Sequence, residues 1–509
     1  MTRITNLPDN TLMVVFRLLD GRSLASCQNT CVFWYNIIAS WSDAWKACVL
    51  AEIEPFVVWF LFCQHWGLRM QEYSVIWTNP CLNYRQFNVH VVNGLANRAE
   101  SELSSLANET LRSDTYKVPS LLSRKSNVDC KNGVGLTYCC CRTPSSITIN
   151  NNKQLWKRVY STWCRSAKLE SCVRLTKLIN SQRKITTVKA IGDFIVAGEY
   201  DGVVSLWNSI SCRELGRCKR HKQKVGDIAL YRITDDSHTE HECWCARCHI
   251  VIALTVSPQC DNIALSWINL RLGSIEAAKD INHTATGYYS VSCGKEMFAV
   301  RNIQNRLVVW NIETVFHEEK PQPVIDTCIP TPRCISLWSE TIYCLDEHRA
   351  VTCALDGSNA IRWQPTVPAQ NTIWKDRGIV VCGPLFIAVN GFNIWLALCG
   401  HKFNHFAVQH AGMQLSLATV CGNLLAVGTE DGQVYIYFMN ISSLTKTVQI
   451  NPNCPVARVK LDRQVFGLEL GLGADGTYYL VAMTTDGMLL NRWLQQSDSI
   501  APAIPPLRV

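Results

Sequence analysis

The segment HECWCARCH, from His241 to His249, contains side chains that bind metal ions readily. It offers two histidines and the thiols of Cys243, Cys245 and Cys248. Structural zinc sites need four such ligands, usually as two pairs held apart by a loop, and only one C-x-x-C pair is present here. Cys245-x-x-Cys248-His249 also matches the c-type haem attachment pattern, which requires an exported chain. The N-terminal MTRITNLPDN has no apolar core of the signal-peptide kind, so we interpret the segment as a loop and expect no metal and no cofactor.

A basic run, CKRHKQK from Cys218 to Lys224, is a second candidate site. Arg217, Lys219, Arg220 and Lys222 are suited to charge-assisted hydrogen bonds with an acidic or phosphorylated peptide. A solvated loop explains the same run without any ligand. Both interpretations stay open, and the four residues are our candidates for target binding.

Enzyme motifs are missing from the sequence. It has no Walker-type glycine loop, no G-x-S-x-G and no H-E-x-x-H, so we expect a protein that is not an enzyme. The net charge of +8 over 509 residues is a mild bias, and no dense basic tract indicates nucleic acid. The segment from Phe56 to Gly67 is too short to span a bilayer, so no membrane partner is expected. Because the 26 cysteines accompany no secretion signal, we expect free thiols and a cytoplasmic or nuclear location.

The elements that would position such residues are repeated strand pairs in the second half of the chain. Seven segments share one pattern, in which an apolar strand, a polar turn and a second apolar strand follow one another. They span residues 194–208, 250–269, 296–311, 341–357, 385–400, 424–438 and 478–493. Most of the spacings are close to the length of one blade of a propeller, which argues against a β-sandwich.

Turn and closing residues strengthen this prediction. Asp-Gly pairs place glycine where a tight hairpin needs a positive φ, at Gly202, Gly432 and Gly487. Aromatic residues that would fill the space between blades close several repeats, at Trp207, Trp310 and Tyr437. The segments resemble WD repeats, and this resemblance implies a WD-type β-propeller. The Trp-Asp ending is never met, and only His221 and His410 suggest a remnant of the Gly-His opening.

The N-terminal segment from Leu7 to Val49 has the character of a helical docking module. Leu12, Val15, Phe16 and Leu19 recur at spacings of three and four, which predicts one apolar helical face. About forty residues cannot bury so many large side chains alone. The segment resembles an F-box, through the Leu-Pro opening and the later apolar steps. That resemblance implies docking on the Skp-type adaptor of a cullin ubiquitin ligase through the residues Leu7, Pro8, Leu12, Val15, Phe16, Leu24 and Trp34. Some of these must instead support the module from within, and an ordinary helical hairpin packed on the rest of the protein is the alternative.

We therefore predict an α+β multidomain protein with a small all-α F-box, a helical linker and an all-β propeller. The predicted domains are the F-box at 1–50, a helical and partly disordered linker at 51–182, the propeller at 183–497 and a tail at 498–509. Seven blades is the best count, with six or eight open. The resemblance implies a substrate receptor of an SCF-type cullin–RING ligase, with the adaptor, the cullin and the RING protein as partners and a target held by the propeller. The alternative is a non-catalytic scaffold that uses the propeller for protein–protein interaction without ubiquitin transfer.

Overall fold

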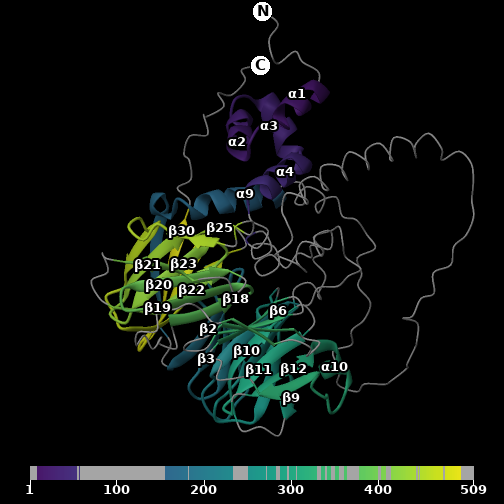
Figure 1. The fold of residues 1–509 in the computed structure, drawn as a ribbon, viewed down its shortest axis with the longest axis vertical. Coiled ribbons are helices and arrows are strands. Elements are labelled where there is room, and N and C mark those ends of the chain that lie inside the picture. The colour runs from purple at the N-terminus through teal and green to yellow at the C-terminus, as the bar shows by residue number, and fades with distance from the viewer. Residues whose placement is uncertain are drawn as a thin grey trace, which may run out of the picture.

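The protein consists of a group of helices seated on a ring of β-sheets (Figure 1). The computed structural model describes residues 9–53, 57, 155–180, 183–232 and 250–494. Short gaps in the last range fall at 271, 283–286, 295–296, 305, 329–333, 339–340, 346–349, 355–359, 364–377, 399–402, 409–413, 443–444, 446 and 474–475.

The N-terminal helices form a small module that we call the helical module. It contains α1 (Asp9–Phe16), α2 (Gly21–Gln28), α3 (Val32–Ser40) and α4 (Ser42–Glu52). Short polar side chains start two of them: Asp20 accepts a 2.7 Å hydrogen bond from the Ser23 amide, and the Cys31 sulfur accepts one from the Trp34 amide. A further helix, α9 (Leu155–Ser166), lies between this module and the ring (Figure 1).

Seven four-stranded antiparallel sheets are present among the described residues. Six of them follow the chain from the innermost strand outward. These are β2 (Ile185–Ile191), β3 (Phe194–Glu199), β4 (Val203–Asn208) and β5 (Glu214–Lys219); β6 (Asp227–Arg232), β7 (Ile250–Val256), β8 (Asn262–Asn269) and β9 (Ser274–Asn282); β10 (Tyr288–Cys293), β11 (Met297–Asn302), β12 (Arg306–Asn311) and β13 (Ile325–Cys328); β14 (Cys334–Trp338), β15 (Thr341–Leu345), β16 (Ala350–Ala354) and β17 (Ala360–Trp363); β18 (Ile379–Cys382), β19 (Leu385–Asn390), β20 (Asn393–Leu398) and β21 (Asn404–Ala407); and β22 (Leu415–Cys421), β23 (Leu424–Thr429), β24 (Gln433–Phe438) and β27 (Ala457–Lys460).

The seventh sheet closes the ring. It combines β28 (Val465–Leu472), β29 (Tyr478–Thr484) and β30 (Gly487–Leu494) with β1 (Val173–Asn180), which pairs with β30 from Val173 opposite Leu494 to Asn180 opposite Gly487. The innermost strands β2, β6, β10, β14, β18, β22 and β28 contact one another in this order, and β28 contacts β2. The expected β-propeller is therefore confirmed. Its first strand lies inside the range predicted as linker, so the predicted boundary at 183 is corrected to Val173; β1 was missed because its partner is distant in sequence.

Each of the seven predicted hairpins is the central strand pair of a different sheet. The turn glycines Gly202, Gly432 and Gly487 have φ of +84°, +92° and +134°, as their Asp-Gly pairs predicted. Trp310 and Tyr437 are completely buried, and Trp207 nearly so. The Asp-Gly pairs therefore predicted the turns correctly, and the closing aromatic residues predicted buried positions correctly.

Hydrogen bonds join neighbouring sheets at the centre of the ring. In each, a side chain of one innermost strand accepts a hydrogen bond from a backbone amide at the unpaired edge of the neighbouring sheet's innermost strand. Five such bonds are found, namely Val291 N to Asp227 Oδ2 (3.0 Å), Leu337 N to Ser292 Oγ (2.9 Å), Gly383 N to Ser336 Oγ (2.9 Å), Leu470 N to Thr419 Oγ1 (3.3 Å) and Ala190 N to Glu469 Oε1 (3.4 Å). At the closure point, Lys189 of β2 forms a 3.5 Å ion pair with Glu469 of β28. These contacts satisfy backbone amides that no strand can reach.

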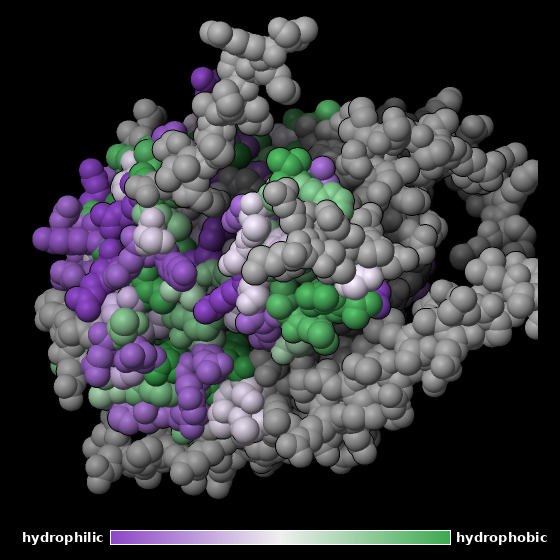
Figure 2. Space-filling model, turned by 90° about the horizontal axis from the view of Figure 1, so that it is seen from above, coloured by the Kyte–Doolittle hydropathy of each residue, from purple (hydrophilic) through white to green (hydrophobic). Residues whose placement is uncertain are grey.

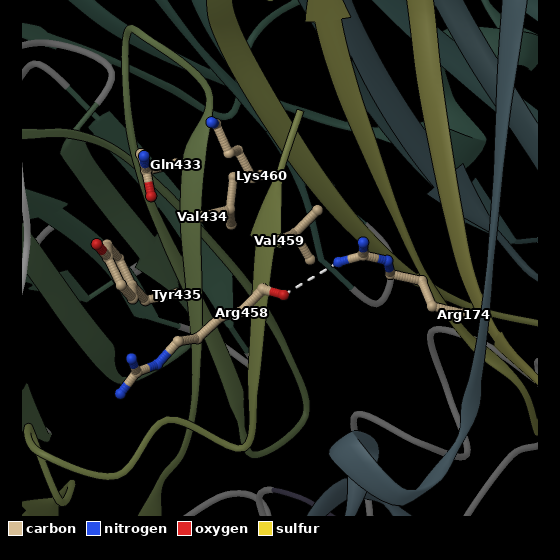
Figure 3. A pocket seen from close by; sticks show the side chains of 7 residues that line it. All are labelled: Arg174, Gln433, Val434, Tyr435, Arg458, Val459 and Lys460. Atoms are coloured by element: carbon tan, nitrogen blue, oxygen red, sulfur yellow. Dashed lines mark hydrogen bonds between the residues drawn. The ribbon is translucent and has the colours of Figure 1, made fainter. Parts of the chain in front are cut away.

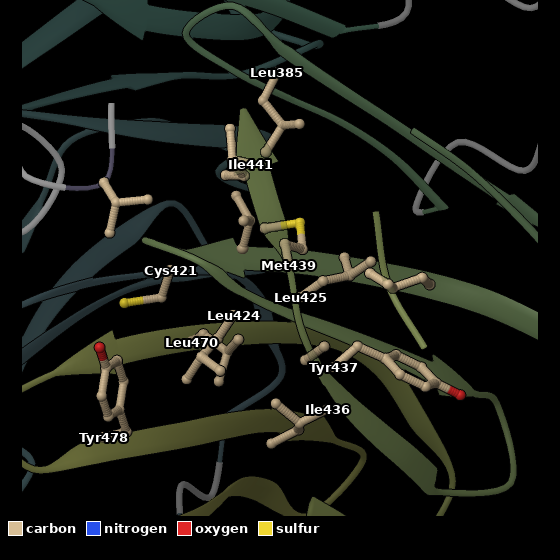
Figure 4. Close-up of a cluster of buried hydrophobic side chains, with 14 of the residues drawn as sticks. Leu385, Cys421, Leu424, Leu425, Ile436, Tyr437, Met439, Ile441, Leu470 and Tyr478 are labelled. Atoms are coloured by element: carbon tan, nitrogen blue, oxygen red, sulfur yellow. The ribbon is translucent and has the colours of Figure 1, made fainter. Parts of the chain in front are cut away.

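The largest hydrophobic cluster runs without a break from the helical module into the propeller. It includes Trp45 of α4, Tyr160 of α9 and Leu424 of β23. A hairpin of β25 (Asn440–Ser442) and β26 (Thr447–Gln449) adds Ile441 to this cluster and contacts the sheet of β20 and β21. Figure 4 shows the propeller side of the cluster, where Ile441 and Met439 pack above Leu425. The remaining short elements are η4 (Leu169–Ser171) and α10 (Ile312–His317).

Candidate interaction surfaces

The inner side of the helical module consists of residues predicted from the apolar spacing. Leu12, Phe16 and Leu24 are at most 2% exposed. Trp34 is partly buried, and its ring meets that of Phe16 edge-on at 5.3 Å between centroids. In this structure these four residues hold α1, α2 and α3 together. Leu12, Phe16 and Leu24 therefore have almost no surface left for direct contact with a partner.

The module also exposes a separate set of large apolar side chains, which we call the helical patch. Its members and their exposed fractions are Val14 (59%), Val15 (47%), Leu18 (83%), Val32 (75%) and Phe33 (40%). Val14 and Val15 lie on α1, Leu18 lies in the turn that follows this helix, and Val32 and Phe33 begin α3. Figure 2, which views the molecule from above, shows hydrophobic side chains exposed between hydrophilic ones. A cluster of this kind on a folded protein is characteristic of an interaction surface.

Only one of the seven residues that the F-box resemblance nominated, Val15, lies in the helical patch. Leu7 and Pro8 lie outside the described residues. The sequence analysis missed Val14, Leu18, Val32 and Phe33. An available signal was the unbroken apolar character of LMVVF in α1, because a helix that is apolar on more than one face buries only part of its surface in its own module.

Glu52 at the end of α4 links the helical module to α9. Its Oε1 accepts a 2.8 Å hydrogen bond from the Gly21 amide, and its Oε2 accepts a 2.7 Å hydrogen bond from the Tyr160 hydroxyl. The Tyr160 ring lies against Gly21 so closely that a Cβ there would be 2.3 Å from the ring carbon Cζ. Burial, together with the hydrogen bond to Glu52, raises the pKa of Tyr160 far above its usual value, so the hydroxyl stays a donor.

Aromatic rings continue this connection into the propeller. Trp45 of α4 packs on Tyr160 at 5.8 Å between centroids, Tyr160 on Trp163 at 5.7 Å, and Trp163 on Phe438 of β24 at 6.4 Å. The helical patch is therefore carried on a support that is packed against the ring. Its position relative to the propeller is set by buried contacts.

The four predicted target-binding cations are mostly engaged by the propeller itself. Arg217 pairs with buried Glu199 at 3.4 Å, and the Lys219 amino group donates to the Asp201 carbonyl. Arg220 is almost buried: it donates to the carbonyls of Leu265 and Lys279, each at 3.1 Å, and pairs with Asp280 at 2.5 Å, which ties two neighbouring sheets together. Lys222 is exposed. Three of the four cations therefore have partners within the propeller, and Lys222 is the one whose side chain is described only as exposed.

His221, which follows Arg220, is buried between the same two sheets. Its ring nitrogens lie 2.9 Å from Thr255 Oγ1 and 3.2 Å from Asn262 Oδ1. Burial lowers the pKa of His221 below its ordinary value, and the neighbouring Arg220 charge acts in the same direction. This histidine therefore has a structural role in the propeller. His410 lies outside the described residues.

The candidate metal segment at 241–249 also lies outside the described residues. Within the described ranges, no three His, Cys, Asp or Glu side chains are grouped so that they could hold a metal ion. None of the helices in that part of the chain has both the length and the apolar character needed to cross a membrane.

Comparison with known proteins returns likeness to solved structures alone. No family model matches the chain, and no curated protein matches it. The crystal structure of the RRP9 WD40 repeats is 10% identical, with a TM-score of 0.45, over 62% of this chain and 97% of that one. The structure of U3-55K is 10% identical, with a TM-score of 0.46, over 63% of this chain and 98% of that one.

Proposed function

We propose that this protein is a non-catalytic interaction protein that binds one partner through the helical patch and others through its propeller. The helical patch is the observation that carries this proposal. Its five side chains remain in contact with solvent, although Leu12, Phe16 and Leu24 of the same module are buried in the core. Burying such a side chain against a partner is worth about 1.5–3 kcal/mol. A surface of this composition is unfavourable in water and gains from being covered.

The connection through Glu52, Tyr160 and Trp163 adds to this proposal. Because α9 packs on both the module and the ring, a partner held at the patch would have a fixed direction relative to the propeller. Two proteins bound to one rigid support have a raised effective concentration for each other. This is the property that an assembly protein needs.

Affinity capture of the full-length protein from cell extract, followed by mass spectrometry, tests the proposal. Leu18→Asp with Val32→Asp should remove a defined group of captured proteins. Leu272→Asp is the matched control, because Leu272 is 75% exposed on the propeller, like Val32 on the module. Unchanged capture by the double variant, with its melting temperature unaltered, would show that the patch binds nothing.

A narrower proposal follows from the F-box resemblance, and the position of the helical patch favours it. The patch lies on α1, on the turn that follows it and on α3, all within the segment that carries the resemblance. In this proposal, the patch docks on the Skp-type adaptor of an SCF-type ligase and the propeller selects the target. Catalysis would then belong to a separate ubiquitin-conjugating enzyme, to which the bound target is brought close.

Purified adaptor and cullin test the narrower proposal. The wild-type protein and Leu272→Asp should capture both, and Leu18→Asp with Val32→Asp should bind at least about tenfold more weakly, a loss of about 1.4 kcal/mol or more. Failure of the wild-type protein to capture the adaptor would refute the ligase proposal. The broader interaction proposal would still be tested by its own capture experiment.

A further inference from the structure

Strand β1 differs from the other outer strands of the propeller. Like the other outer strands, it has an outer edge with which no described strand pairs. It also exposes three large aliphatic side chains, Val173 (46%), Leu175 (39%) and Leu178 (41%). Among the other outer strands with described side chains, only β5 exposes one, Leu215. Open edges with exposed aliphatic residues are templates for the addition of another strand.

Positive charge accompanies this edge. Arg174 and Lys177 of β1 are exposed, and no described carboxylate forms an ion pair with either. Arg458 and Lys460 are exposed on the neighbouring outer strand β27, where Asp462 lies 3.6 Å from Lys460. The edge as a whole therefore attracts anionic groups, with Arg174 and Lys177 as its available cations.

A groove of about 450 Å³ lies where β1 and β27 come together. Arg174 spans it and donates a 3.1 Å hydrogen bond to the carbonyl of Arg458. Figure 3 shows Arg174 reaching across from β1, with Val459 on β27 beside it and the Arg458 side chain pointing away. The hydrogen bond fixes the Arg174 guanidinium at the mouth of the groove and leaves its remaining donors for a ligand.

We propose that an extended, acidic segment of a partner protein binds along the outer edge of β1 and adds a fifth strand to the sheet that closes the ring. Alternate aliphatic side chains of the segment pack on Val173 and Leu175, and the carboxylates between them pair with Arg174, which lies on the opposite face of the strand. Lys177, on the same face as Val173 and Leu175, adds positive charge at longer range. A second copy of β1 is a poor occupant, because edge-to-edge pairing would bring two sets of cations together. The proposal rests on the interaction role proposed above, but it uses a different surface from the helical patch.

A labelled, terminally blocked eight-residue peptide of alternating Glu and Val tests the proposal by fluorescence anisotropy with the full-length protein. The Glu-Val peptide should bind at least tenfold more tightly than its Lys-Val counterpart. Arg174→Glu with Lys177→Glu should weaken binding at least tenfold. Lys320→Glu should leave binding unchanged, because Lys320 is an exposed lysine in the segment between α10 and β13. Methylation of alternate backbone nitrogens on the peptide edge that faces β1 should abolish binding, because strand addition needs those amides.

Three results would overturn the proposal. The first is that the Glu-Val peptide does not bind at millimolar protein concentration. The second is that the Arg174→Glu, Lys177→Glu variant binds it as tightly as the wild-type protein does. The third is that peptides methylated on either edge bind as tightly as the unmethylated peptide. The same binding measurement is also made with phosphatidylserine vesicles in place of the peptide. Vesicle binding that exceeds peptide binding and depends on the same two residues would identify a membrane site in place of a strand site. Leu18→Asp with Val32→Asp should bind the peptide normally, so failure at β1 is distinguishable from failure of the helical patch.

Discussion

Removing the Tyr160 hydroxyl should loosen the helical module from the propeller without unfolding either part. In Tyr160→Phe, the ring still packs between Trp45 and Trp163, but the 2.7 Å hydrogen bond to Glu52 is lost. A hydrogen bond to a charged group contributes about 1.5–3 kcal/mol net, and Glu52 keeps its second bond to the Gly21 amide. We therefore expect a loss of about 2 kcal/mol, which is about 30-fold in the equilibrium between docked and undocked module.

Native-state amide hydrogen exchange measures this equilibrium element by element. Amides of α4 that exchange through undocking should exchange about 30-fold faster in Tyr160→Phe than in the wild-type protein. Those of β29, deep in the ring, should not change. Tyr200→Phe is the control, because Tyr200 is 58% exposed on the propeller and should affect neither element. Unchanged exchange in α4 would refute the claim that the Glu52 contact anchors the module. Equal acceleration in β29 would show that the variant destabilises the whole protein and not only the docking of the module.

Three further predictions concern the ring. Gly202→Ala should destabilise the fold by about 3 kcal/mol in urea unfolding, because the added Cβ would lie 2.1 Å from a carbonyl oxygen. Gly391→Ala is the control: its added Cβ meets open space, so it should cost only about 1–2 kcal/mol, from the left-handed backbone conformation. The folded-state pKa of His221 is lowered, so the unfolded chain binds more protons. The contribution of His221 to stability should therefore be complete above about pH 6.5 and should fall as the pH drops below it. Melting scans should show a weaker fall in His221→Gln and an unchanged one in exposed His317→Gln. Calorimetry of the full-length protein should show a cooperative transition of the propeller. Deletion of 173–180 should open the ring and abolish this transition, and an unchanged transition would contradict closure by β1.

Local features of this protein could be read from its sequence because local interactions specify them. Apolar alternation between turn residues placed all seven hairpins, and the Asp-Gly pairs identified glycines with positive φ. The spacing of Leu12 and Phe16 predicted a buried helical face, since both side chains lie one turn apart on α1. Each of these signals lies within a few residues of the structure that it specifies.

Long-range packing decided the rest. Strand β1 joins the ring because it pairs with β30, more than three hundred residues away, and no local pattern distinguishes such a strand from a linker. Arg220 looked available for a ligand until the neighbouring sheet supplied two carbonyls and Asp280. Val15 and Phe16 are adjacent and equally apolar, yet one is exposed and the other buried. The packing of α3 against α1, with Trp34 on Phe16, separates them, because burial depends on which neighbours the folded chain brings near.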